Sequence, residues 1–144
     1  MKKLLKKLFP LFIASILMIF TLVCTACSEQ DVEVSKYQLK KVYVDEDNLS
    51  GGIFEVGNMC GDVLLTSDLV VLELSSDHTL QITYKMGQTT TTQAGIWMQM
   101  FESMYSVNTS DLKVTAYKNG DTILFSNSYI LGVDAYFILE KVGN

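Results

Sequence analysis

The 144-residue chain has no arginine, one histidine and one proline. Without guanidinium groups, the chain is poorly suited to gripping phosphate or carboxylate ligands through paired hydrogen bonds. One histidine excludes a zinc site with several histidine ligands. The sequence also lacks a phosphate-binding glycine loop and a Gly-x-Ser-x-Gly motif. These absences predict a protein that is not an enzyme and needs no metal or cofactor.

Positive charge is scarce outside the first residues of the chain. Residues 28–144 keep seven lysines and all sixteen acidic residues, which gives a formal charge of −9. An acidic domain is repelled by nucleic acid and by anionic membrane surfaces. We therefore predict no nucleic-acid partner, and no membrane attachment through a basic patch.

The N-terminus has the order of a secretory signal peptide. Four lysines among the first seven residues precede an apolar run from Leu8 to Val23, and small residues then precede Cys27. The run is shorter than the roughly 20 residues of a transmembrane helix and contains Pro10. With a cysteine at the cleavage point, the segment resembles the bacterial lipoprotein signal, in which that cysteine takes a diacylglycerol. Ordinary cleavage and an uncleaved anchor are the alternatives.

Two cysteines compete for the lipid. Cys24 follows the bulky Val23, whereas Cys27 follows the small residues Thr25 and Ala26. We therefore predict residues 1–26 as a helical signal peptide, Cys27 as the lipidated residue, and residues 27–36 as a tether to the cell membrane. Acyl chains add about 0.8 kcal/mol per buried methylene, and two or more anchor a protein stably. The expected location is extracytoplasmic, in the cell envelope.

The rest of the chain alternates apolar and polar residues with a period of two. Leu80, Ile82, Tyr84 and Met86 alternate with polar residues, which predicts a half-buried strand over 79–86. Short polar turns at 75–78 and 118–121 each predict a β-hairpin, and the second contains the strong hairpin signal Asn119-Gly120. Further strands are expected at 37–44, 69–75, 96–105, 112–116, 123–125 and 136–142.

The connections complete the expected fold. Residues 49–61 contain four glycines and predict an irregular connection with one helical turn around Ile53 to Val56. The run Thr89–Thr92 is interpreted as a polar hairpin tip. Cys60 has no partner for an internal disulfide and is expected to be a buried small apolar residue. Short strands joined by tight turns predict an all-β fold over 37–144, an antiparallel meander that closes into a small barrel.

These residues resemble the small lipocalin-like domains of bacterial membrane lipoproteins. The resemblance covers most of residues 37–142 and is carried by Leu72-Glu73-Leu74, Ser76-Asp77-His78-Thr79-Leu80, Gly95-Ile96-Trp97, Leu112-Lys113-Val114, Asn119-Gly120-Asp121-Thr122-Ile123-Leu124 and Tyr136-Phe137-Ile138-Leu139-Glu140-Lys141. His78 stands where the family usually has a turn glycine, and the Gly-x-Trp lies in the middle of the domain. The resemblance implies a barrel, and no binding residues are transferred from the family.

Two polar clusters offer weak alternatives to a binding role. Asp77 and His78, next to serines, lie on a turn where neighbours point apart, so a hydrolase triad is not expected. The run 45–48 (DEDN) lacks the glycine and distal glutamate of a calcium loop. It is interpreted as a solvated acidic turn.

The segment 97–105 carries the candidate binding residues. As one strand it would place Trp97, Phe101 and Tyr105 on one face and Met98, Met100 and Met104 on the other, so that both faces are apolar. One alternative is that residues 49–61 cover the second face. The other is that the segment contacts a small apolar ligand or an envelope protein.

The sequence thus predicts a lipid-anchored, extracytoplasmic, non-catalytic binding protein. A small barrel of about eight strands can hold one ligand or be filled by its own side chains. The expected ligand is a small apolar molecule inside the barrel. The alternative is a protein–protein interaction or inhibitor module at the cell surface.

Overall fold

The computed structural model describes residues 31–45, 51–127, 131–132 and 134–143. The predicted signal peptide, Cys24, Cys27 and most of the acidic run at 45–48 lie outside these residues. From Val32 onward the chain forms one compact unit. The described part of the chain contains no helix that is long and apolar enough to cross a membrane.

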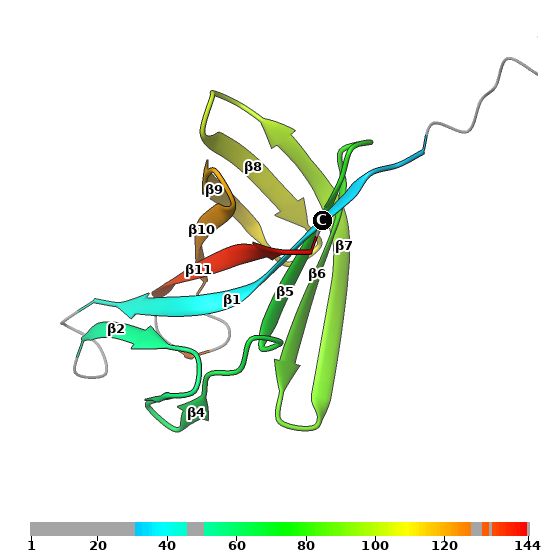
Figure 1. Ribbon diagram of the computed structural model, residues 1–144. Coiled ribbons are helices and arrows are strands. Elements are labelled where there is room, and N and C mark those ends of the chain that lie inside the picture. The colour runs from blue at the N-terminus through cyan, green and yellow to red at the C-terminus, as the bar shows by residue number, and fades with distance from the viewer. Residues whose placement is uncertain (1–30, 46–50, 128–130, 133, 144) are drawn as a thin grey trace, which may run out of the picture. The chain divides into compact units, whose positions relative to one another are not determined.

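Eight strands form an antiparallel meander that closes into a barrel (Figure 1). Each pairs with the next in the series, and the last pairs with the first. They are β1 (Val34–Val44), β5 (Val70–Ser75), β6 (Thr79–Met86), β7 (Thr89–Gln99), β8 (Met104–Thr109), β9 (Lys113–Asn119), β10 (Thr122–Asn127) and β11 (Ala135–Val142). The predicted fold class is confirmed, and β1 starts three residues earlier than expected.

The barrel interior is filled by the inward side chains of its own strands. On β6, Leu80, Ile82 and Tyr84 are buried while the residues between them are not. Phe125 and Phe137 stack across β10 and β11 with ring centroids 6.0 Å apart. The alternation of apolar and polar residues in the sequence therefore places the core correctly, because each strand has one solvent-exposed face.

One edge of strand β1 pairs with β11 over residues 36–44, and its other edge changes partner halfway along. On this second edge, residues 34–38 pair with β5 and residues 41–44 pair with β2 (Gly52–Glu55). A bulge between Leu39 and Lys41, seen in the pairing with β11, lies between the two parts. The segment after β2 contains the short hairpin β3 (Met59–Cys60) and β4 (Val63–Leu64). This segment fills the wedge-shaped space between β2 and β5, beside β1. The Leu39 N–H donates to the Ser67 carbonyl at 3.1 Å, and Leu65 and Leu69 are buried there.

The predicted helical turn at Ile53 to Val56 is wrong. Residues Gly52–Glu55 form a strand because they pair with β1, with Ile53 opposite Tyr43. Cys60 is 1% exposed, so its predicted burial is confirmed.

Two boundaries around β7 also differ from the prediction. The run Thr89–Thr92 belongs to β7, and the turn lies at Gly87 and Gln88, where Gly87 adopts φ 60°. Threonine suits an extended strand because it is β-branched. The predicted single strand 96–105 is wrong, because β7 ends at Gln99 and the chain reverses before β8. In that turn the Met100 N–H donates to the Met104 carbonyl at 2.9 Å.

Candidate functional site

The turn after β7 separates the six predicted binding residues into three groups. Trp97 and Tyr105 point inward from β7 and β8, half-buried against the core. Their ring centroids lie 5.5 Å apart. The Trp97 indole N–H donates to the Ser75 carbonyl at 3.0 Å, which fixes the ring at one end of the barrel. These two side chains therefore take part in packing.

The other four candidates lie on the outside. Met98 and Met104 stand on the outer faces of β7 and β8, and Met100 and Phe101 lie in the turn between them, with Phe101 69% exposed. Residues 51–61 do not cover Met98, because their strand pairs with β1. The structure thus brings Trp97 and Tyr105 together and does not join all six residues in one site.

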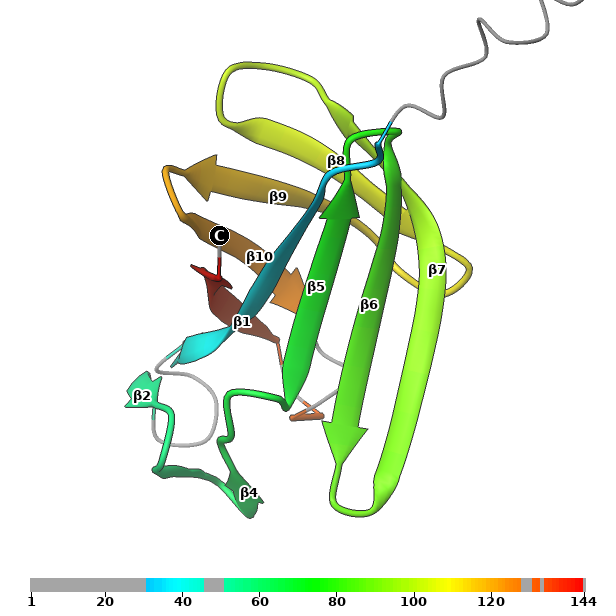
Figure 2. The same cartoon turned by 45° about the vertical axis from the view of Figure 1, so that its right-hand side comes forward.

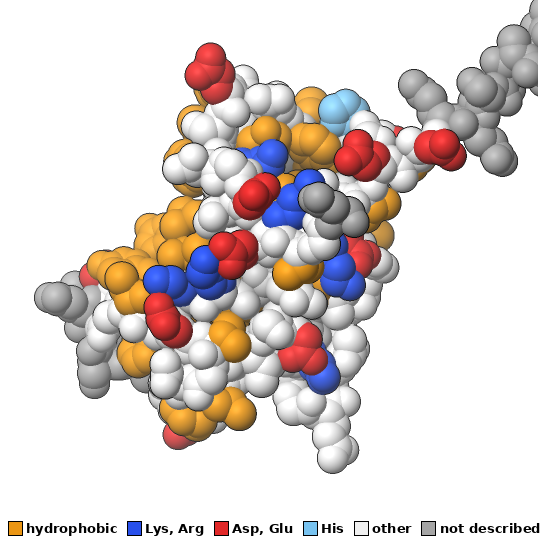
Figure 3. Space-filling view, in the orientation of Figure 1, with side chains coloured by type: hydrophobic (Ala, Val, Ile, Leu, Met, Phe, Trp, Pro, Cys, Tyr) orange, Lys and Arg blue, Asp and Glu red, His pale blue; other side chains and the backbone are white. Residues whose placement is uncertain are grey.

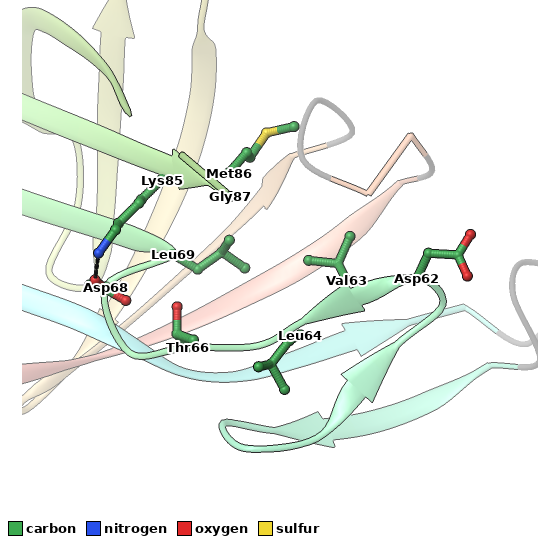
Figure 4. A pocket seen from close by; sticks show the side chains of 9 residues that line it. All are labelled: Asp62, Val63, Leu64, Thr66, Asp68, Leu69, Lys85, Met86 and Gly87. Atoms are coloured by element: carbon green, nitrogen blue, oxygen red, sulfur yellow. Dashed lines mark hydrogen bonds and ion pairs between the residues drawn. The ribbon is translucent and has the colours of Figure 1, made fainter. Parts of the chain in front are cut away.

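A groove lies at another place, between the β3–β4 hairpin and the adjoining ends of β5 and β6 (Figure 4). Its volume is about 400 Å³. Val63 and Leu69 point toward each other across it, while Leu64 points away. The residues that line it are Asp62, Val63, Leu64, Thr66, Asp68, Leu69, Lys85, Met86 and Gly87. The groove is thus an open hollow with apolar walls.

Local chain geometry builds this groove. Gly61, with φ 59°, provides the positive φ in the turn between β3 and β4. The Leu65 N–H donates to the Asn58 carbonyl at 3.0 Å and the Gly57 N–H donates to the Leu65 carbonyl at 2.8 Å. Because Leu65 is fully buried, these bonds hold the hairpin against the barrel. Val63 is thereby placed opposite Leu69.

An ion pair closes one end of the groove. Lys85 Nζ lies 2.5 Å from Asp68 Oδ2. Hydrogen bonds from Lys85 and Thr66 hold the pKa of the Asp68 carboxyl below its usual value. The Asp68 carboxyl is therefore charged at neutral pH. In the described residues no cluster of histidine, cysteine, aspartate and glutamate could hold a metal ion.

The groove can therefore hold a small apolar molecule that has a polar group at the end next to the ion pair. Its volume falls within the roughly 300–1,000 Å³ of small-molecule sites. Sequence reasoning missed it because β3 and β4 have two residues each, too few for a periodic pattern. The closest signal was the run of glycines that marked 49–61 as a connection.

Comparisons with protein-family models, curated proteins and solved structures give no match for this chain. The eight-stranded antiparallel barrel therefore rests on the structure alone.

Proposed function

We propose that this protein is a lipid-anchored lipoprotein of the cell envelope with a lipocalin-like, non-catalytic barrel that binds a small apolar molecule. The observation that carries the proposal is the groove of about 400 Å³ in which Val63 and Leu69 face each other. The filled interior favours this external groove over the inside of the barrel as the ligand site.

The anchor is supported by the sequence before the barrel. Six residues, 28–33, separate Cys27 from β1, and an extended chain of this length spans at most about 22 Å. The barrel would therefore work next to the bilayer. The mature chain from its own host is expected to begin at a diacylglyceryl Cys27, measured by intact mass. Cys27→Ala should abolish the lipid mass, and Cys24→Ala should retain it. Retention of the lipid in Cys27→Ala would contradict Cys27 as the lipidated residue, and a wild-type chain without the lipid mass would contradict the anchor.

Ligand binding is tested by filling the groove. Val63→Trp places a large ring in the hollow. Met59→Trp is the matched control, because Met59 belongs to the same β3–β4 hairpin, is 53% exposed and does not line the groove. The probe is N-phenyl-1-naphthylamine, a neutral apolar fluorophore, titrated into the full lipoprotein in detergent. Far-UV circular dichroism and the thermal midpoint show that both variants are folded.

We expect Val63→Trp to weaken probe binding by about tenfold or more and Met59→Trp to change it by less than about twofold. Met86→Gln, at the exposed rim, should weaken binding by about threefold and provides a milder variant. Equal affinity in wild type, Val63→Trp and Met86→Gln would overturn the proposed site.

A further inference from the structure

The barrel wall is open between β9 and β10. These strands pair through three residue pairs, Thr122 with Asn119, Ile123 with Lys118, and Leu124 with Tyr117. Beyond these pairs β9 extends back to Lys113 and β10 extends to Asn127. Figure 2 shows the two strands diverging from their common turn.

The divergence leaves two strand edges without ladder partners. Residues 113–116 of β9 pair with β8 on one side, and residues 125–127 of β10 pair with β11 on one side. In the part of the chain that the structure describes, no strand pairs with the other side of either segment. Backbone N–H and C=O groups on such edges are free to pair with another extended chain. This opening can therefore accept a backbone in the extended conformation.

A groove of about 370 Å³ occupies the outer side of this opening. Tyr117 of β9 and Tyr136 of β11 are 47% and 44% exposed, and Leu124 lies between their strands. The Tyr43 ring continues the surface, with its centroid 6.0 Å from that of Tyr136. Figure 3 shows apolar side chains gathered over β11 and β1, beside a band of lysines and acidic residues. The groove thus offers aromatic contacts next to the open edges.

Lys113 supplies a charge for which the described residues contain no ion-pair partner. Lys36, Lys40, Lys41 and Lys85 each contact a carboxylate, whereas Lys113 lines the groove without one. In an acidic domain, an available cation in the groove favours a partner with an acidic group at that place.

We infer that the opening between β9 and β10 docks an extended peptide segment of a partner protein. The segment pairs its backbone with the free edge of β9 or β10, which is strand addition. Its alternate side chains pack on Tyr117, Leu124 and Tyr136, and an acidic residue meets Lys113. This site is separate from the groove of Figure 4, and its failure would leave the proposed function intact.

The experiment begins with a library of short linear peptides displayed on phage and selected on the full lipoprotein in detergent. The enriched peptides are synthesised and titrated against two folded variants. Ser126→Trp fills the groove, and Thr122→Trp is the matched control on the same strand and face, in its paired half. We expect about tenfold weaker binding to Ser126→Trp and less than about twofold change for Thr122→Trp.

Two further measurements distinguish strand addition from non-specific binding to an apolar surface. N-methylation of alternate peptide amides should abolish binding for one set of positions and spare the other set, because only one edge of the peptide pairs. Lys113→Glu should weaken acidic peptides by about threefold or more. No enriched peptide, equal binding to Ser126→Trp and wild type, or tolerance of both N-methylation patterns would overturn the inference.

Discussion

The rings of Trp97 and Tyr105 lie 5.5 Å apart between centroids, tilted by 44°, across the β7–β8 hairpin. The turn at 100–103 makes this contact, because it folds the two strands onto each other in the register Trp97 opposite Val107. The His78 ring also packs near Trp97, with 5.1 Å between the ring centroids. The three rings hold together the turn between β5 and β6 and the end of β7.

Trp97→Phe should destabilise the barrel by about 1–3 kcal/mol, because the Ser75 carbonyl loses its indole donor and packing is reduced. Urea unfolding followed by far-UV circular dichroism measures the change. Phe101→Ala is the control: Phe101 is 69% exposed, so its loss should cost less than about 0.5 kcal/mol. Equal effects of the two variants would contradict the structural role of Trp97.

Gly95→Ala should be among the most damaging single substitutions. A Cβ at Gly95 would lie 2.0 Å from the backbone carbonyl oxygen of Asn108, so β7 and β8 would have to separate. We expect a loss of about 3 kcal/mol or more of the free energy of unfolding. Gly120→Asn is the control, because that turn has φ 58° and open space around it, which asparagine tolerates. Full stability of Gly95→Ala would show that the strands are farther apart.

Most of the barrel could be predicted from the sequence because its strands have one buried and one solvent-exposed face. The alternation of Leu80, Ile82 and Tyr84 and the Asn119-Gly120 turn define two hairpins in which local pattern and tertiary contact agree. The prediction of one strand over 96–105 was wrong because both faces are apolar there. The alternation of apolar and polar residues therefore could not show that the chain reverses after Gln99. The helical turn at 53–56 failed because pairing with β1, a long-range contact, decides its conformation.

His78 adopts φ 70°, a left-handed conformation that glycine adopts more readily than other residues. His78→Val should cost about 1–2 kcal/mol, because a β-branched residue is strained at positive φ. His78→Gly should stay within about 0.5 kcal/mol of wild type, since relief of strain offsets the lost ring contact with Trp97. Thermal unfolding of both variants measures this difference. A valine variant as stable as the glycine variant would contradict the turn geometry.

Cys60 is buried, and burial raises the pKa of its thiol. Iodoacetamide at about pH 8 should alkylate Cys60 at least roughly tenfold more slowly in the native protein than in urea, measured by mass spectrometry. Because the folded pKa is the higher one, the contribution of Cys60 to stability is full below its unfolded pKa of about 8.5. That contribution declines as pH rises from there through the folded pKa. Rapid native alkylation would contradict the buried position.

The candidate grooves could not be predicted from the sequence. Val63 and Leu69 face each other only because β1 exchanges β5 for β2, which leaves a wedge for the β3–β4 hairpin. The opening beside Tyr117 depends on where β9 and β10 stop pairing, and the residues after Leu124 keep a regular strand pattern. Both features arise from strand partners, which a single sequence pattern does not specify.

Native mass spectrometry of the protein purified from its own host tests the central proposal most directly. Wild type and Met59→Trp should each carry a small apolar molecule, seen as the same added mass, and Val63→Trp should lack it. An added mass that persists in Val63→Trp, or none in wild type, would contradict a ligand site in the groove between β4 and β5.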